Sequence, residues 1–258
     1  MYIKKDRLEN GVNSYASADS GAGMDVELLL LGAGERYELT ESKKETAFLL
    51  FSGRALWSAG GREQQICRED MFKEGTWCLH ISRGTPAVIE ARSDCEIYIQ
   101  KAVNPREFEP HFYTPEDVST VEAGNHGELD GTMHRYIRTI FDYSNAPYSN
   151  MVLGEVQNLP GRWSSYPPHH HPQPEVYFFR FDKPQGFGAG FGNGEIYRTG
   201  HNQLLVIESG FHSQVCAPGY NMVYVWGIRH LDGDPWVKTR IDDEEHKWLL
   251  EESESLYK

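Results

Sequence analysis

The chain has 258 residues and a formal net charge of −13, and its length allows one large β domain or two of about 100 to 130 residues each. The negative charge argues against a nucleic-acid partner, because such a partner requires a basic surface. No run of about 20 apolar residues could cross a bilayer, and Met1 to Asp6 lack the apolar core of a signal peptide. We therefore expect a cytoplasmic protein that binds neither nucleic acid nor membranes.

The four cysteines are scattered through the chain without a Cys-x-x-Cys pair. Neither a disulfide framework nor a zinc ribbon is therefore indicated. We expect Cys67, Cys78, Cys95 and Cys216 to be reduced and mostly buried.

The first half of the chain alternates short apolar segments with turns. Its many glycines, prolines and aromatic residues favour an all-β fold, and turns every 8 to 12 residues, roughly, are typical of a sandwich or a barrel. Ser52-Gly53 and Gly60-Gly61 mark two of these turns. The expected strands are residues 26–32, 45–50, 54–57, 62–67, 76–81, 87–91 and 95–102.

The second half repeats this plan. EVYFFRF, which begins at Glu175, parallels ETAFLLF, which begins at Glu45, and NMVYVWGI parallels CEIYIQKA. This register places His212 on Thr85, and no His-x-His precedes Glu45. A repeat of this kind predicts two lobes of one design, the first without metal ligands.

Composition suggests where the lobes begin and end. Residues 104–148 are polar and rich in turns, although 133–143 is strand-like or briefly helical, and the charged segment 242–257 is expected to form a short helix that closes over the barrel. The predicted organisation is an N-terminal lobe at 1–103, a connector at 104–148, and a C-terminal metal-binding lobe with its closing segment at 149–258.

The segment GRWSSYPPHHHPQPEVY, residues 161–177, contains the strongest candidates for metal ligands. On a strand, side chains at i and i+2 share a face, so His169 and His171 can reach one ion, and the neighbouring prolines would stiffen the backbone. Glu175, which starts the next strand, is the expected third ligand, and His212 the fourth. The alternatives are a histidine-rich surface loop and, for His212, a core histidine.

These spacings resemble the two metal motifs of the cupin barrel. The fuller set GRWSSYPPHHH, EVYFF, GFH, APGY and DDEEHKW is similar to the 5-deoxy-glucuronate isomerase family of inositol catabolism, mainly over residues 150–250. The resemblance implies two tandem cupin-type jelly-roll lobes, of which only the C-terminal one binds metal. One departure is Glu208, which stands where the second cupin motif usually has proline, so we expect a looser turn before His212.

The resemblance also implies an activity. It indicates an aldose-ketose isomerase that converts 5-deoxy-glucuronate to 2-deoxy-5-keto-gluconate with one divalent metal ion. A His/Glu ligand set can bind Zn, Mn, Fe, Ni or Co and does not identify which of them is present. The alternatives are a uronate ketol-isomerase of pectin breakdown, an iron-dependent cupin dioxygenase and a non-catalytic cupin that binds sugar acids. The expected partner is a small anionic sugar, and a homo-oligomer is one of the states that the sequence leaves open.

An acidic protein that binds an anion needs a local cation. We prefer Arg138, because a guanidinium can bind a carboxylate through two hydrogen bonds, with Arg135 as the competitor. Glu155 lies on an otherwise apolar segment and is either the proton-transfer residue or a buried structural acid. Tyr177 and Tyr220 are expected to contact the substrate, with packing as the alternative.

Overall fold

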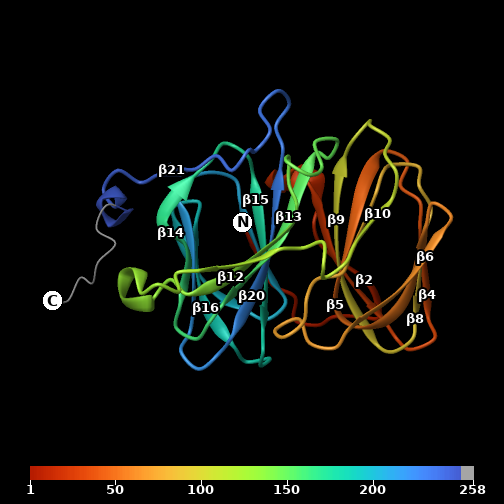
Figure 1. The fold of residues 1–258 in the computed structure, drawn as a ribbon, viewed down its shortest axis with the longest axis horizontal. Coiled ribbons are helices and arrows are strands. Elements are labelled where there is room, and N and C mark those ends of the chain that lie inside the picture. The colour runs from red at the N-terminus through yellow and green to blue at the C-terminus, as the bar shows by residue number, and fades with distance from the viewer. Residues whose placement is uncertain (251–258) are drawn as a thin grey trace. The chain divides into compact units, whose positions relative to one another are not determined.

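The computed structural model describes residues 1–250, which form an all-β protein, as expected from the sequence. The chain divides into two compact units. We call residues 6–119 and 140–152 the N-terminal unit, and residues 1–5, 120–139 and those from 153 onward the C-terminal unit. Figure 1 shows the strands of both units.

A nine-stranded sheet system forms the N-terminal unit. Its main path runs β10-β7-β5-β9-β3-β2, while β6 and β8 pair with β5, and β4 pairs with β8. A short π-helical turn (η1, Ala18–Ala22) follows β2. The strands are β2 (Gly11–Ala16), β3 (Asp25–Leu31), β4 (Arg36–Leu39), β5 (Lys44–Ala59), β6 (Arg62–Arg68), β7 (Cys78–Ile81), β8 (Ala87–Ala91), β9 (Cys95–Val103) and β10 (His111–Tyr113).

One long strand organises this unit. β5 has 16 residues and runs through the position at which a turn was predicted. Its first half pairs with β7 and β9, and its second half pairs with β6 and β8. Gly53 permits the bend between the halves, because its φ is +111° and a Cβ there would lie 2.4 Å from the Asp94 carbonyl oxygen. Buried side chains of both halves, including Phe48 and Trp57, contribute to one core.

Two sheets form the C-terminal unit. The seven-stranded sheet has the order β1-β18-β15-β20-β13-β12-β11 and the five-stranded sheet the order β17-β16-β19-β14-β21. The strands are β1 (Tyr2–Ile3), β11 (Thr120–Ala123), β12 (Arg135–Phe141), β13 (Met151–Asn158), β14 (Trp163–His170), β15 (Glu175–Phe181), β16 (Phe187–Gly192), β17 (Glu195–Gly200), β18 (Gln203–Ile207), β19 (His212–Cys216), β20 (Met222–Arg229) and β21 (Ile241–Asp242). Two 3-10 turns, η2 (Glu128–Gly131) and η3 (Lys247–Leu250), complete it.

The segment 104–148 contributes strands to both units. It contains β10, β11 and β12, and residues 104–119 belong to the N-terminal unit, whereas 120–139 belong to the C-terminal unit. The predicted closing segment 242–257 is described only as far as residue 250, where η3 provides a short helical turn. Within the described part of the chain, no helix has the length and apolar character needed to span a membrane.

The two units repeat one strand order. The path β7-β5-β9-β3-β2 in one unit corresponds to β18-β15-β20-β13-β12 in the other. Glu45 pairs with Ala102, the last residue of CEIYIQKA, and Glu175 pairs with Ile228, the last residue of the parallel segment NMVYVWGI, so Glu45 and Glu175 occupy equivalent places.

The register differs from the prediction at the next strand. His212 is the first residue of β19 and pairs with His169, whereas Ala87 is the first residue of β8 and pairs with Leu39. His212 therefore corresponds to Ala87 and not to Thr85. At these two positions the N-terminal unit has apolar side chains in place of imidazoles.

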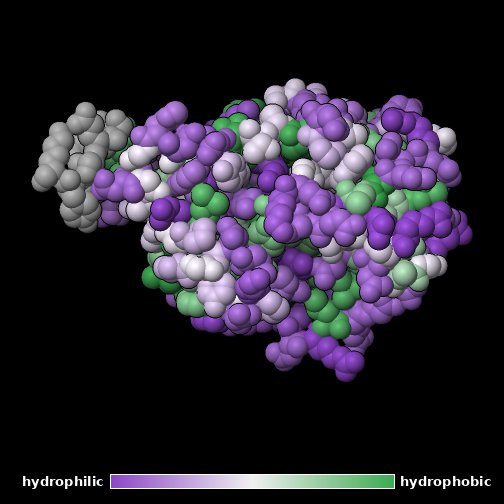
Figure 2. All heavy atoms as spheres, turned by 60° about the horizontal axis from the view of Figure 1, so that its bottom comes forward, coloured by the Kyte–Doolittle hydropathy of each residue, from purple (hydrophilic) through white to green (hydrophobic). Residues whose placement is uncertain are grey.

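The surface agrees with the charged composition. On the face drawn in Figure 2, hydrophilic residues predominate and hydrophobic residues form small, separate patches. Cys78, Cys95 and Cys216 are buried, Cys67 is exposed, and all four are free thiols.

Candidate functional site

Three side chains of the C-terminal unit converge in a group that could hold a metal ion. His171 directly follows β14, Glu175 begins β15, and His212 begins β19. Their ligand atoms all lie within 4.8 Å of one another, and all three residues are buried. The Nε2 atoms of His171 and His212 each lie 3.3 Å from Oε2 of Glu175.

His169 lies beside this group. It pairs with His212 across the β14-β19 ladder, and the centroids of the two rings are 4.4 Å apart. His170 points elsewhere and places its ring 4.9 Å from that of Phe211. This alternation matches the behaviour expected of a His-x-His strand.

The donor atoms suit a divalent cation. Oε2 of Glu175, both ring nitrogens of His212 and Nδ1 of His169 are buried without a hydrogen-bond partner among the described residues. Burial lowers the pKa of His169 to about 3, helped by the charge of Arg240. Burial also lowers the pKa of His212 to about 4, against the opposing influence of Glu175. Both imidazoles are therefore neutral near pH 7, as metal ligands must be.

A backbone carbonyl fixes the orientation of His171. Its Nδ1 lies 2.9 Å from the carbonyl oxygen of Gln173, which can only accept, so Nδ1 carries the proton and Nε2 keeps its lone pair. A hydrogen bond of this kind is typical of histidines that bind metals.

We call His171, Glu175 and His212 the ligand group. The ligand group forms part of the wall of a cavity of about 200 Å³. Hydroxyl groups line one side: Oγ of Ser165 lies 3.3 Å from the Tyr177 hydroxyl and 3.4 Å from that of Tyr224, and the Tyr224 hydroxyl donates to Oγ of Ser164 over 3.0 Å. Burial raises the pKa of Tyr224 to about 12. Burial, with Glu175 nearby, raises the pKa of Tyr177 as well. Both phenols therefore keep their protons; Ser164 accepts that of Tyr224, whereas Tyr177 can donate a hydrogen bond into the cavity.

Two indoles form another part of the wall. The rings of Trp226 and Trp236 lie 5.7 Å apart in an edge-on arrangement, and Trp236 lies 6.2 Å from His171. Beyond Trp236 the lining continues with Lys238, Thr239 and Arg240. The cavity thus combines apolar rings, hydroxyl donors and cationic side chains around the ligand group.

Arg138 and Glu155 lie on the opposite face of the seven-stranded sheet from the cavity. Val156 lines the cavity, and successive residues of a strand point to opposite faces, so Glu155 points away. Nη1 of Arg138 lies 3.5 Å from Oε2 of Glu155, and Nη2 donates to Gln157 over 3.4 Å. This placement supports the interpretation of Glu155 as a buried structural acid and gives Arg138 a carboxylate of its own.

Arg135 points to the face of β12 opposite to that of Arg138. It lies three residues before Arg138, so the two side chains point to different faces. Arg135 donates to the carbonyl oxygen of Met133 over 2.7 Å and interacts electrostatically with Tyr224 and Arg240, both of which line the cavity. Arg135, the alternative to Arg138 as the anion-binding residue, is thus the arginine that lies toward the cavity.

Tyr220 lies apart from the cavity lining. It occupies the loop between β19 and β20, where its ring packs 5.9 Å from that of Phe187. The sequence did not single out Ser165, Trp236, Lys238, Thr239 or Arg240. The segment after β20 has no apolar periodicity, so only its two cations, Lys238 and Arg240, could have suggested a role.

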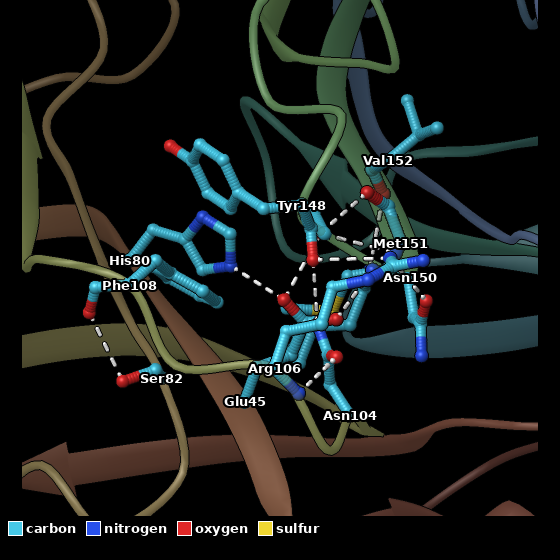
Figure 3. A network of polar contacts seen from close by, with 12 residues as sticks. Glu45, His80, Ser82, Asn104, Arg106, Phe108, Tyr148, Asn150, Met151 and Val152 are labelled. Carbon is cyan, nitrogen blue, oxygen red and sulfur yellow. Dashed lines mark hydrogen bonds and ion pairs between the residues drawn. The ribbon is translucent and has the colours of Figure 1, made fainter.

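The N-terminal unit has a carboxylate at the place equivalent to Glu175, but its oxygens are occupied. Oε2 of Glu45 lies 2.9 Å from Nε2 of His80 and accepts from Oγ of Ser149 over 3.0 Å, and Oε1 accepts from the backbone N–H of Asn150 over 2.7 Å. Figure 3 shows this network. The ring of His80 stacks on Phe141 at 4.3 Å. Glu45 is therefore a fully bonded structural acid.

Comparisons with known proteins agree with the geometry. The KduI/IolB family model matches residues 2–249. A 5-deoxy-glucuronate isomerase of Bacillus licheniformis is 23% identical, over 88% of each chain, and one of Bacillus velezensis is 26% identical, over 95% of this chain and 96% of the relative.

Solved structures show the same fold. An IolB-like protein of Salmonella typhimurium has a TM-score of 0.86 at 20% identity, over 96% of this chain and 98% of the other. A Lactobacillus farciminis oxalate decarboxylase has a TM-score of 0.64 at 14% identity, over 95% of this chain and 87% of the other. A cupin barrel protein of Leptotrichia buccalis has a TM-score of 0.51 at 13% identity, over 88% of this chain and 92% of the other. With a family model that spans almost the whole sequence, this chain belongs to the KduI/IolB family of isomerases and has the cupin fold.

Proposed function

We propose that the protein is a metal-dependent aldose-ketose isomerase that converts 5-deoxy-glucuronate to 2-deoxy-5-keto-gluconate in inositol catabolism. The observation that carries this proposal is the buried group His171, Glu175 and His212 at the wall of the cavity, in a chain whose relatives are named 5-deoxy-glucuronate isomerases.

One divalent ion would be held by His169, His171, Glu175 and His212. When bound, such an ion acts as a Lewis acid that polarises the sugar carbonyl and lowers the barrier to enolisation. The neutral imidazoles and the hydrogen bond from His171 to Gln173 prepare the ligands before the ion arrives.

The Tyr177 phenol would stabilise the negative charge that develops on a substrate oxygen. Isomerisation moves a proton between two neighbouring carbons through an enediol, so charge accumulates on oxygen in the transition state. Tyr177 stays protonated because burial raises its pKa, and it can therefore donate a hydrogen bond to that charge; Tyr224 also keeps its proton but donates it to Ser164. Ser165, within 3.4 Å of both hydroxyls, positions them relative to each other.

Metal analysis together with an assay on a panel of uronates tests the proposal. We expect one equivalent of metal per chain and turnover of 5-deoxy-glucuronate without oxygen uptake, because isomerisation consumes nothing. Oxygen consumption that follows turnover would instead indicate dioxygenase chemistry. Full activity in protein stripped of metal would contradict the role of the ligand group.

A further inference from the structure

A segment after β20 lines one wall of the cavity and is anchored at both ends next to the candidate ligands. We call residues 235–240, PWVKTR, the strap. It follows a tight hairpin closed by a bridge between Leu231 and Asp234 and leads into β21. Figure 1 shows it as the blue segment between β20 and β21.

The anchors tie the strap to the two sides of the His-x-His segment. On one side, Nε2 of Gln173 donates to the carbonyl oxygen of Asp234 over 2.9 Å, and the backbone N–H of Trp236 donates to Nδ1 of His230 over 3.0 Å. On the other side, β21 pairs with β14 so that Asp242 lies opposite His169. The strap is therefore a fixed wall of the cavity whose side chains are held near the ligand group.

Two cationic side chains of the strap, those of Lys238 and Arg240, line the cavity. The Arg240 guanidinium is oriented by its neighbours, since Nη2 donates to the carbonyl oxygen of Pro167 over 2.8 Å and Nε pairs with Asp242. Its Nη1 has no hydrogen-bond partner among the described residues. With 35% of its side chain exposed, Arg240 is held in place yet can still bind an oxygen ligand.

A third cation lies near Arg240. Arg135 is partly buried, and burial together with the like charge of Arg240 lowers its pKa. Two guanidiniums that repel each other beside a cavity gain stability when an anion binds near both. The cavity thus presents positive charge on an otherwise acidic protein.

We propose that Arg240, supported by Lys238 and Arg135, binds the carboxylate of the substrate, which makes the cavity a site for sugar acids and not for neutral sugars. This assignment rests on the proposed function, because the carboxylate bound by Arg240 belongs to the same substrate whose carbonyl group would lie at the metal. It is preferred over Arg138, because Arg138 and its partner Glu155 face the opposite side of the sheet from the cavity.

The preference for a carboxylate can be measured with two stable probes, D-glucuronate and D-glucuronamide, which differ in one group. Calorimetric titration of the metal-loaded protein should show tighter binding of glucuronate. In Arg240→Ala this preference should fall about 10- to 100-fold, the scale of a lost hydrogen bond between charged groups. Arg240→Lys should restore only part of it, because a single ammonium cannot reproduce the guanidinium geometry.

Arg198 provides the matched control. Its guanidinium lies over the Phe187 ring at 4.9 Å, away from the cavity lining. Arg198→Ala should leave the preference unchanged, and the metal content of every variant should match that of the wild type, which shows that the ligand group is intact.

Two results would overturn the inference: a wild-type protein that binds both probes equally, or an Arg240→Ala variant that keeps the full preference. The second would also be the result if the metal alone bound the carboxylate. If only the proposed function is wrong, the result differs: the protein would still prefer glucuronate, this preference would still depend on Arg240, and no uronate would be isomerised.

Discussion

Replacing Glu155 with Gln tests which face of the seven-stranded sheet carries the chemistry. Glu155 is completely buried and lies 3.5 Å from Arg138, whose own exposed fraction is 8%. The substitution keeps the shape of the side chain but removes its charge. Arg138 would then keep a buried positive charge beside a neutral amide.

The cost follows from this burial. Removing one partner of a buried ion pair destabilises a protein by about 3 to 5 kcal/mol, because the remaining charge stays desolvated. The Gln carbonyl can still accept a hydrogen bond from the guanidinium, so we expect the lower end, about 3 kcal/mol. That corresponds to about a 150-fold change in the ratio of folded to unfolded protein.

Urea unfolding followed by tryptophan fluorescence measures this loss, and steady-state kinetics and metal analysis of the folded variant complete the test. We expect metal content to be unchanged and kcat/KM to stay within about twofold of wild type, since no transition-state contact is removed. Glu195→Gln, at an exposed position of β17, controls for the charge change. A variant of normal stability that turns over about 100-fold more slowly would refute the reasoning and identify Glu155 as the proton-transfer group.

Three further predictions follow from the site. His171→Ala should lose metal and activity in parallel, as metal analysis and kinetics on the same samples would show; an active variant without metal would contradict the ligand assignment. Tyr177→Phe should keep its metal and lower kcat about 100- to 1,000-fold, the range for a lost oxyanion donor; an unchanged kcat would show that Tyr177 only packs. Glu45→Gln should destabilise the protein by about 1 to 3 kcal/mol in urea but leave the metal at one per chain, and a changed stoichiometry would contradict its structural role.

The sequence was most informative where strand geometry alone determines position. Alternation along His169 to His171 predicted that two imidazoles share a face and one does not, and the structure has this arrangement. Local spacing suffices there because the period of a strand is two residues. The equivalence of Glu45 and Glu175 could be read for the same reason, since both lie near the start of central strands that pair in the same way with β9 and β20.

Sequence alone could not decide which face of a strand meets the cavity. The segment with Glu155 and Val156 is buried on both faces, so its apolar pattern does not alternate and gives no sign of the inward side. The strap is a second case. Its six residues have no regular pattern, and their position follows from anchors at His230, Gln173 and β14, of which Gln173 and β14 lie far from the strap in sequence.

The two glutamates show why residue type and position in the sheet do not suffice to identify a ligand. Glu45 and Glu175 occupy equivalent places near the start of β5 and β15, and both are buried. The oxygens of Glu45 are occupied by His80, Ser149 and Asn150, whereas Oε2 of Glu175 lies near two imidazole nitrogens without a hydrogen bond. Because burying a carboxylate oxygen without a hydrogen bond is costly, Oε2 of Glu175 suits a cation and the fully bonded oxygens of Glu45 do not, so the residues that surround each carboxylate distinguish the two acids.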